Sequence, residues 1–206
     1  MSDRLRKIDS NGTASTRIYE LIEPAFILFM GHGGESELHG ACGRYGEMHV
    51  DLQATQENPD FYDKGKFIDY NNVGVFRGQI LFCFSCNSNR NTPHSLARNS
   101  ILNGVECFVG FGNIPTDYIE GTPFSKRCIA IYKGIIIKVI KHSLKYAHSN
   151  NETIDNVVRI IRILATQEIQ GLMLGRDFHG RREVVDQLYK FKNEIKIYGN
   201  RYSRIY

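Results

Sequence analysis

The sequence predicts an α/β fold, a parallel or mixed sheet with helices on both faces. Three short apolar runs, at residues 25–30, 79–85 and 105–111, have the length of buried strands. They are apolar almost throughout, which is typical of parallel strands that are covered on both faces. Segments with helical periodicity lie between and after them, and this alternation favours an α/β architecture. With 206 residues, 42% of them hydrophobic, the chain is long enough to bury a core.

The expected strands follow one another along the chain. A short helix at residues 15–22, ended by Pro24, precedes the strand at 25–30. Residues 31–46 carry six glycines and are expected to be loop. Two weaker strands are expected at 47–52 and 66–69, before the apolar strands at 79–85 and 105–111, and an edge strand at 194–198 closes the series.

The expected helices fall mainly in the second half of the chain. The first runs from Pro93 to about residue 102, where Asn103-Gly104 has the form of a C-cap. Pro123 opens a helix to about residue 133, and Gly134 separates it from another that ends near residue 149. Two more are expected at 153–168 and 182–191, with a loop at 171–180 between them. We expect a polar segment with a short helix at residues 1–20 and one domain at 21–206.

Composition argues against a membrane-spanning or a secreted protein. No apolar run approaches the roughly 20 residues of a membrane span, and the charged N-terminus lacks the apolar region of a secretory signal. Five cysteines without framework spacing indicate reduced thiols in a cytoplasmic protein. The net charge is +4, and much of the excess is late in the chain, where it is more typical of a solvated face than of a nucleic-acid site. The late basic residues include Lys190, Lys192, Lys196, Arg201 and Arg204.

Two chemically active residues follow two of the predicted strands. His32 follows the strand at 25–30 within Gly31-His32-Gly33, and Cys86 follows the strand at 79–85. The carboxyl ends of neighbouring parallel strands border one crevice, so we expect the two side chains to meet there. A thiol beside an imidazole is a nucleophile beside its base. The pair therefore predicts a cysteine hydrolase, specifically an endopeptidase, with His32 and Cys86 as catalytic residues.

These motifs resemble the caspase-like (clan CD) cysteine peptidases, which include caspases, separases, clostripain-like enzymes and the CHAT family. The sequence is most similar to CHAT proteins, over about residues 20–206. The similar pieces are residues 29–33, 81–88, 109–111, 124–134 and 197–200. Two features depart from the family: residues 1–20 hold no clear counterpart of its first strand, and Asn200 stands without the proline of its terminal motif. The sheet is thus expected to be trimmed, or completed by another chain.

The resemblance implies a caspase-like three-layer sandwich and a His-Cys dyad that needs no third carboxylate, metal or other cofactor. By similarity, the backbone N–H groups of Gly33 and Cys86 hold the oxyanion. Bacterial CHAT proteins often act as regulated effectors, some in antiviral defence against phage, and are switched on by a partner. A protein or peptide substrate and a separate activating protein are therefore expected, with no membrane and no direct nucleic-acid binding.

The substrate pocket is predicted less directly. In caspase-like enzymes the pocket for the P1 side chain includes the loop after the strand that follows the Cys strand. Here that loop contains Asp117 and Glu120, which we assign as substrate-binding residues for a P1 Arg or Lys. Asp51 is a further candidate. The same loop also offers apolar residues, so an apolar pocket stays open as an alternative; they are Ile114, Tyr118 and Ile119.

Three other interpretations compete. Cys83 and Cys86 form a Cys-x-x-Cys motif, which also occurs in redox and zinc sites, although Cys83 is expected inside a strand. A zinc site would need further ligands, and the nearby Cys42, His39 and His49 lack regular spacing. The chain can also be a catalytically idle caspase-like module that binds a partner. A nucleic-acid-binding domain that uses the basic C-terminal region is the third alternative.

Overall fold

The computed structural model describes three ranges of the chain: residues 26–40, 65–115 and 124–205. Its main sheet has the order β1-β4-β5-β6, in which the first three strands are parallel and β6 runs antiparallel to β5. The strands of this sheet are β1 (Phe26–Met30), β4 (Ile80–Phe84), β5 (Cys107–Gly110) and β6 (Lys196–Gly199). A small antiparallel sheet pairs β2 (Glu37–Gly40) with β3 (Gly65–Asp69). The predicted α/β class with a mostly parallel sheet is confirmed.

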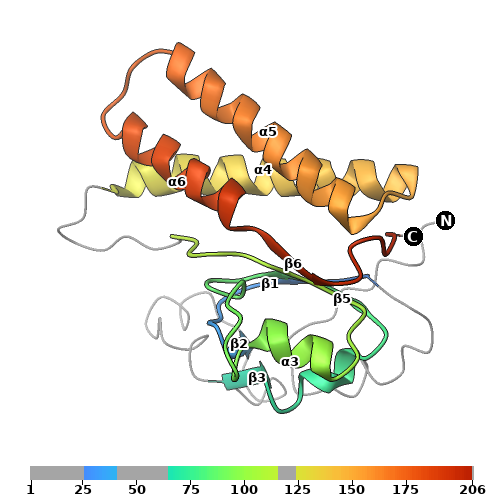
Figure 1. Ribbon diagram of the computed structural model, residues 1–206. Coiled ribbons are helices and arrows are strands. Elements are labelled where there is room, and N and C mark those ends of the chain that lie inside the picture. Colours follow the sequence, from blue (N-terminus) through green and yellow to red (C-terminus); the bar gives the residue numbers. More distant parts are fainter. Residues whose placement is uncertain (1–25, 41–64, 116–123, 206) are drawn as a thin grey trace, which may run out of the picture.

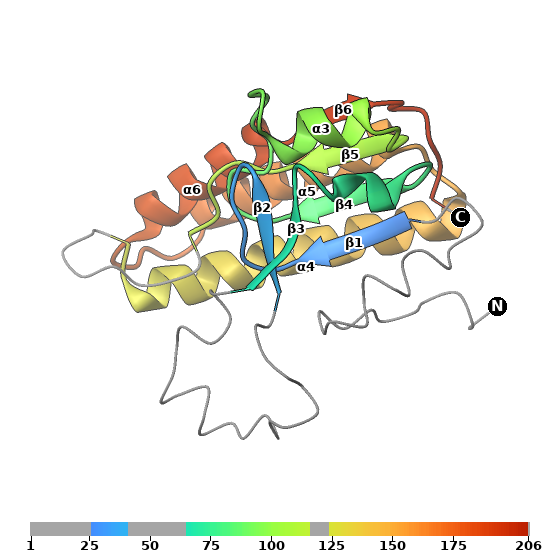
Figure 2. The same cartoon turned by 90° about the horizontal axis from the view of Figure 1, so that it is seen from below.

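The helices differ in length and in the side of the sheet on which they lie. Figure 1 shows α4, α5 and α6 together on one side and the short α3 on the other, and Figure 2 shows α4 running along the sheet. The helical segments are η2 (Val73–Phe76), α3 (Leu96–Leu102), α4 (Lys126–Asn150), α5 (Ile154–Leu174) and α6 (Arg181–Glu194). Within the described residues, no helix is long and apolar enough to cross a membrane.

The core divides where β4 runs through it. All five residues of β4 are buried, and because successive side chains of a strand point to opposite faces, they supply two separate apolar clusters. Phe82 and Phe84 pack in the cluster formed with α4, α5 and α6. Leu81 and Cys83 pack in the cluster that includes residues of η2 and α3. This division decides which side of the sheet each residue after β4 faces.

Hydroxyl caps mark where three helices begin. The side chains of Ser95, Ser125 and Thr153 each accept a hydrogen bond, at 3.3 Å, from the backbone N–H three residues later. The predicted start of the first helix at Pro93 was therefore early, since the helix begins after Ser95. Its predicted end at Asn103 is confirmed, because Asn103 is the C-cap.

Three predictions about glycines were wrong. Gly134 does not divide a helix, since α4 is continuous from Lys126 to Asn150. Gly171, expected to begin a loop, lies inside α5, which continues to Leu174. The glycine-rich stretch at 31–46 is also not all loop, since it contains β2. In each case packing or strand pairing with distant residues outweighs the low intrinsic preference of glycine for regular structure.

The other predicted elements in the described ranges are confirmed with shifts of a few residues at their ends. The apolar strands appear as β1, β4 and β5, the weak strand at 66–69 as β3, and the edge strand as β6. The expectation that all three apolar strands are buried was wrong for β1: it forms the other edge of the sheet, and its Leu28 and Met30 are exposed. The expected helix at 182–191 appears as α6. The helix expected at 15–22 and the strand expected at 47–52 lie outside the described residues.

Candidate functional site

β1 and β4 deliver His32 and Cys86 to the same end of the sheet. The two strands are parallel neighbours, and Met30 is paired with Phe84 at their carboxyl ends. The pairing continues one step further, where the Gly31 N–H donates to the Phe84 carbonyl at 3.3 Å. His32 lies two residues after Met30, and Cys86 lies two residues after Phe84. Both backbones therefore reach the edge of the sheet at which sites form in open α/β folds.

Cys86 lies on a tight turn that β5 holds in place. The Asn87 N–H donates to the Gly112 carbonyl at 2.9 Å, and the Asn89 N–H donates to the Phe111 carbonyl at 3.0 Å. Asn87 has φ of 55°, a left-handed conformation that asparagine tolerates better than most residues. The turn passes so close to β5 that a Cβ on Gly110 would lie 2.7 Å from the Ser88 carbonyl carbon. The backbone that carries Cys86 is therefore fixed against β5 and the segment that follows it.

The buried hydroxyl of Ser88 connects the parts of this turn. Its Oγ lies 2.9 Å from the carbonyl oxygens of both Cys83 and Ser85, to which it donates. The same oxygen accepts a hydrogen bond from the Phe111 N–H at 2.9 Å. One fully buried side chain thus satisfies backbone groups of β4, of the turn and of the segment after β5.

The Cys86 thiol differs from the other described cysteines in access to solvent. Cys86 is partly buried, and its Sγ donates to the Ile114 carbonyl at 3.2 Å. Cys83, Cys107 and Cys128 are fully buried. Loss of hydration raises the pKa of Cys83 to about 12 despite hydrogen bonds from serine side chains, and burial followed by the charge of Glu106 raises the pKa of Cys107 to about 12. Those two thiols stay neutral and inert at physiological pH.

His32 has an exposed side chain and a fixed backbone. Its carbonyl accepts a hydrogen bond from the His39 N–H at 3.0 Å, which ties it to β2. Among the described residues, the imidazole has no hydrogen-bond partner. Nearby, the carboxylate of Glu35 accepts from the Thr92 hydroxyl, and the Glu35 carbonyl accepts from the Leu96 N–H at 2.8 Å. Glu35 is therefore engaged with the start of α3 rather than with His32.

The two amides predicted to hold an oxyanion, those of Gly33 and Cys86, make no hydrogen bond to any residue that the structure describes. Gly33 also lies against the Cys86 turn, since a Cβ at this position would be 3.1 Å from the Ser85 Oγ and 2.8 Å from the Glu37 carbonyl oxygen. Only glycine fits there without displacing backbone.

The Cys-x-x-Cys motif does not bring its two thiols to one side of the sheet. Cys83 packs in the cluster next to α3, whereas Cys86 packs against the cluster of α4, α5 and α6. In the described ranges, no three residues of the types that ligate metals gather into a site. The motif therefore gains no support as a redox pair or a zinc site.

Several predicted site residues lie outside the described residues, and two groups near the site were not predicted from the sequence. Asp117, Glu120 and Asp51 lie outside the described residues, as do Cys42 and His49. The structure adds the Ile114 carbonyl, which accepts from the thiol, and a buried tyrosine hydroxyl, that of Tyr132. Their sequence context is uninformative, because one is a backbone atom and the other reads as an ordinary apolar position of a helix.

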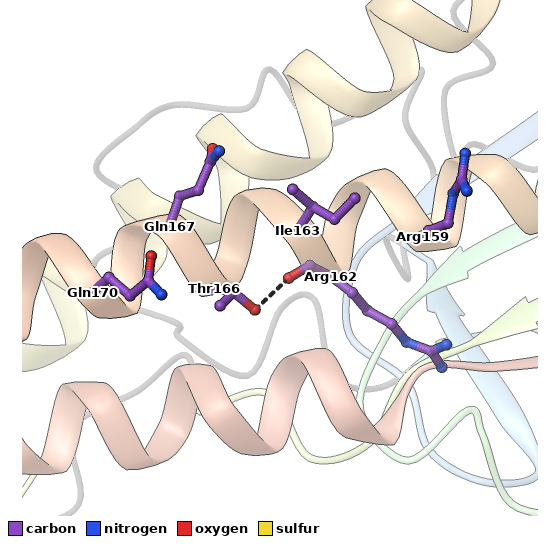
Figure 3. A pocket seen from close by; sticks show the side chains of 6 residues that line it. All are labelled: Arg159, Arg162, Ile163, Thr166, Gln167 and Gln170. Carbon is purple, nitrogen blue, oxygen red and sulfur yellow. Dashed lines mark hydrogen bonds between the residues drawn. The ribbon is translucent and has the colours of Figure 1, made fainter.

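A hollow elsewhere on the molecule is lined by residues of α5 (Figure 3). Two of its polar residues connect α5 to α6 and the residue after it: the Arg162 guanidinium donates to the carbonyls of Lys192 and Ile195, and the Thr166 hydroxyl accepts from the Lys192 ammonium at 3.0 Å. The residues that line it are Arg159, Arg162, Ile163, Thr166, Gln167 and Gln170. None of them is a predicted site residue, so the end of the sheet remains the candidate site.

Comparisons with known proteins do not assign a function. The chain matches no protein-family model, and the searches of curated proteins and of solved structures give no match either.

Proposed function

We propose that the chain is a cysteine endopeptidase of the caspase-like, CHAT type, with Cys86 as nucleophile and His32 as base. The observation that carries this proposal is the delivery of an exposed imidazole and a partly buried thiol to one end of a parallel sheet by paired strands. The unengaged N–H groups of Gly33 and Cys86 support it further, because peptide hydrolysis needs donors for an oxyanion.

The reaction proceeds through a thioester. The Cys86 thiol gives its proton to the His32 imidazole, and the thiolate sulfur attacks the carbonyl carbon of the scissile peptide bond. The carbonyl oxygen becomes an oxyanion, which the N–H groups of Gly33 and Cys86 stabilise. When the carbon–nitrogen bond breaks, His32 protonates the leaving amine. A water molecule, activated by His32, then hydrolyses the thioester and frees Cys86.

The thiol must turn before it can react. Its proton is directed at the Ile114 carbonyl, 3.2 Å from Sγ, so transfer to His32 requires rotation of the Cys86 side chain or a shift of the segment after β5. A dyad that is loose without substrate is common in such enzymes. This feature favours activation by a separate protein that moves the segment. It also supports the alternative function, a catalytically idle module in which the thiol never reaches the base.

Active-site substitution tests the proposal. The Cys86→Ala and His32→Ala variants are compared with the matched Cys83→Ala variant, on a peptide library and with candidate activating proteins. We expect loss of cleavage by at least a thousandfold in the first two variants, because nucleophile and base act as a unit. Cys83→Ala should keep cleavage and lose stability only. Cleavage that survives Cys86→Ala would refute the assignment of the nucleophile. If neither the unmodified protein nor any variant cleaves a peptide, the idle module is favoured.

For the substrate, we propose Arg or Lys at P1, received by Asp117 or Glu120. Carboxylates form charge-assisted hydrogen bonds with these side chains and discriminate against neutral ones. Profiling of single P1 substitutions in the peptide library, repeated with Asp117→Asn and Glu120→Gln, tests the pocket. Equal cleavage after apolar residues, or an unchanged Arg preference in both variants, would contradict it. The free cysteines of the described residues fit a reducing compartment, and we propose the cytoplasm.

A further inference from the structure

Tyr132, on the sheet-facing side of α4, has a buried hydroxyl without a partner. Its side chain is 0% exposed, and within the described part of the molecule its hydroxyl makes no hydrogen bond. The Phe124 ring packs edge-on against it, with the ring centroids 5.9 Å apart. A phenylalanine would fill the same space without leaving a donor unsatisfied, so packing alone does not explain a tyrosine here.

Tyr132 and the proposed nucleophile belong to one apolar cluster. Cys86 packs against the apolar cluster that contains Tyr132, together with Ile114, whose carbonyl accepts from the thiol. Glu194, at the end of α6, lies over the segment after β5: a Cβ on Gly112 would be 2.7 Å from the Glu194 Cβ. Burial raises the pKa of Tyr132, and negative charge on Cys86 and on Glu194 raises it further. The phenol therefore stays protonated and remains a donor when the thiol ionises.

We propose that the Tyr132 hydroxyl donates a hydrogen bond to the Cys86 sulfur once the thiol has given up its proton. This inference rests on the proposed function, for which it supplies a further residue in contact with the reacting sulfur. The Ile114 carbonyl accepts from the neutral thiol but repels a thiolate, since both are then acceptors. When the thiol ionises, the sulfur thus loses the Ile114 carbonyl as its partner and gains the Tyr132 hydroxyl, which has no other partner among the described residues.

The rate of alkylation of Cys86 by iodoacetamide, followed by mass spectrometry from pH 5 to 10, tests this without any substrate. In Tyr132→Phe, we expect the half-maximal rate at a pH about one unit higher and alkylation about tenfold slower at pH 7, because a charge-assisted hydrogen bond is lost. Tyr146→Phe, an exposed position on the same helix, is the matched control and should leave the profile unchanged. A Tyr132→Phe profile equal to that of the unmodified protein would overturn the proposal, whatever its effect on thermal stability.

A second variant keeps the proposal testable if Tyr132→Phe folds poorly. Glu194→Gln removes the negative charge that, besides that of Cys86, acts on Tyr132, so we expect its half-maximal rate at lower pH than in the unmodified protein. No change, or a shift to higher pH, would contradict the role of Tyr132. Because alkylation needs no peptide, a shifted profile without cleavage of any peptide would reject the endopeptidase and keep the thiolate contact. Peptide cleavage with an unshifted alkylation profile would keep the endopeptidase and reject the contact between Tyr132 and the thiolate.

Discussion

Ser88 shows how one small residue positions the nucleophile. Its hydroxyl is buried and bonds to backbone groups on three segments, of which the turn carries Cys86. No apolar residue of similar size can satisfy the Phe111 N–H. At the residue scale, the position of the thiol therefore depends on a serine that takes no part in the chemistry.

A Ser88→Ala variant is expected to lose about 1–3 kcal/mol of the free energy of unfolding, because buried backbone groups are left without a partner. Chemical denaturation measures this loss. Ser100→Ala is the matched control, since Ser100 is equally buried and its hydroxyl has no partner among the described residues. We expect that variant to be near neutral. Equal losses in the two variants would show that the bonds of Ser88 contribute nothing specific.

At the scale of elements, the continuity of α4 has a structural consequence. The helix spans the sheet in one piece, so Cys128 and Tyr132 near its start share a rigid body with the apolar residues near its end. Gly134 lies inside it, exposed to solvent, and no atom lies within 4 Å of the Cβ that another residue would add. After proline, glycine is the residue with the lowest preference for a helix interior, so Gly134 lowers the stability of α4.

Gly134→Ala is expected to raise the free energy of unfolding by about 1 kcal/mol, because alanine restricts the unfolded chain and favours the helix. Thermal and urea unfolding measure the gain. Gly112→Ala provides the contrast: its new Cβ would overlap the Glu194 side chain, and stability should fall. If Gly134→Ala destabilised the protein, a bend or a contact at this position would have to replace the regular helix.

At the scale of the whole molecule, buried thiol and phenol groups make the free energy of unfolding depend on pH in the alkaline range. Burial raises the pKa of Cys83 and of Cys107 to about 12, and it also raises the pKa values of Tyr132 and Tyr198. Each of these groups loses its proton in the unfolded chain before it does so in the folded protein. The folded state therefore binds more protons between the two pKa values, and its stability falls as pH rises through that window.

We expect the free energy of unfolding to decrease steadily between about pH 9 and pH 12, where the two thiols ionise only in the unfolded chain. Urea unfolding under reducing conditions at several pH values measures the slope. Cys83→Ala should lower stability at neutral pH and make the alkaline slope shallower. An unchanged slope in this variant would mean that the Cys83 thiol ionises as easily in the folded protein as in the unfolded chain.

Within the described residues, the sequence by itself determined the class of fold and the positions of its main strands. Continuous apolar runs are typical of strands in parallel sheets, so β1, β4 and β5 were visible as local patterns, although only β4 and β5 are buried throughout. The same runs marked His32 and Cys86, because residues that directly follow neighbouring parallel strands share one edge of the sheet. Such signals are local, and no knowledge of the neighbouring segments is needed to recognise them.

Only the tertiary structure decided how that edge is built. β2 depends on pairing with β3 across a long stretch of sequence, and the continuity of α4 through Gly134 depends on its packing against the sheet. The partner of the thiol is a backbone carbonyl at Ile114, and the unpartnered donor is Tyr132 on a distant helix. These contacts join residues far apart in the chain, and their energies depend on burial and distance, which a linear pattern does not contain.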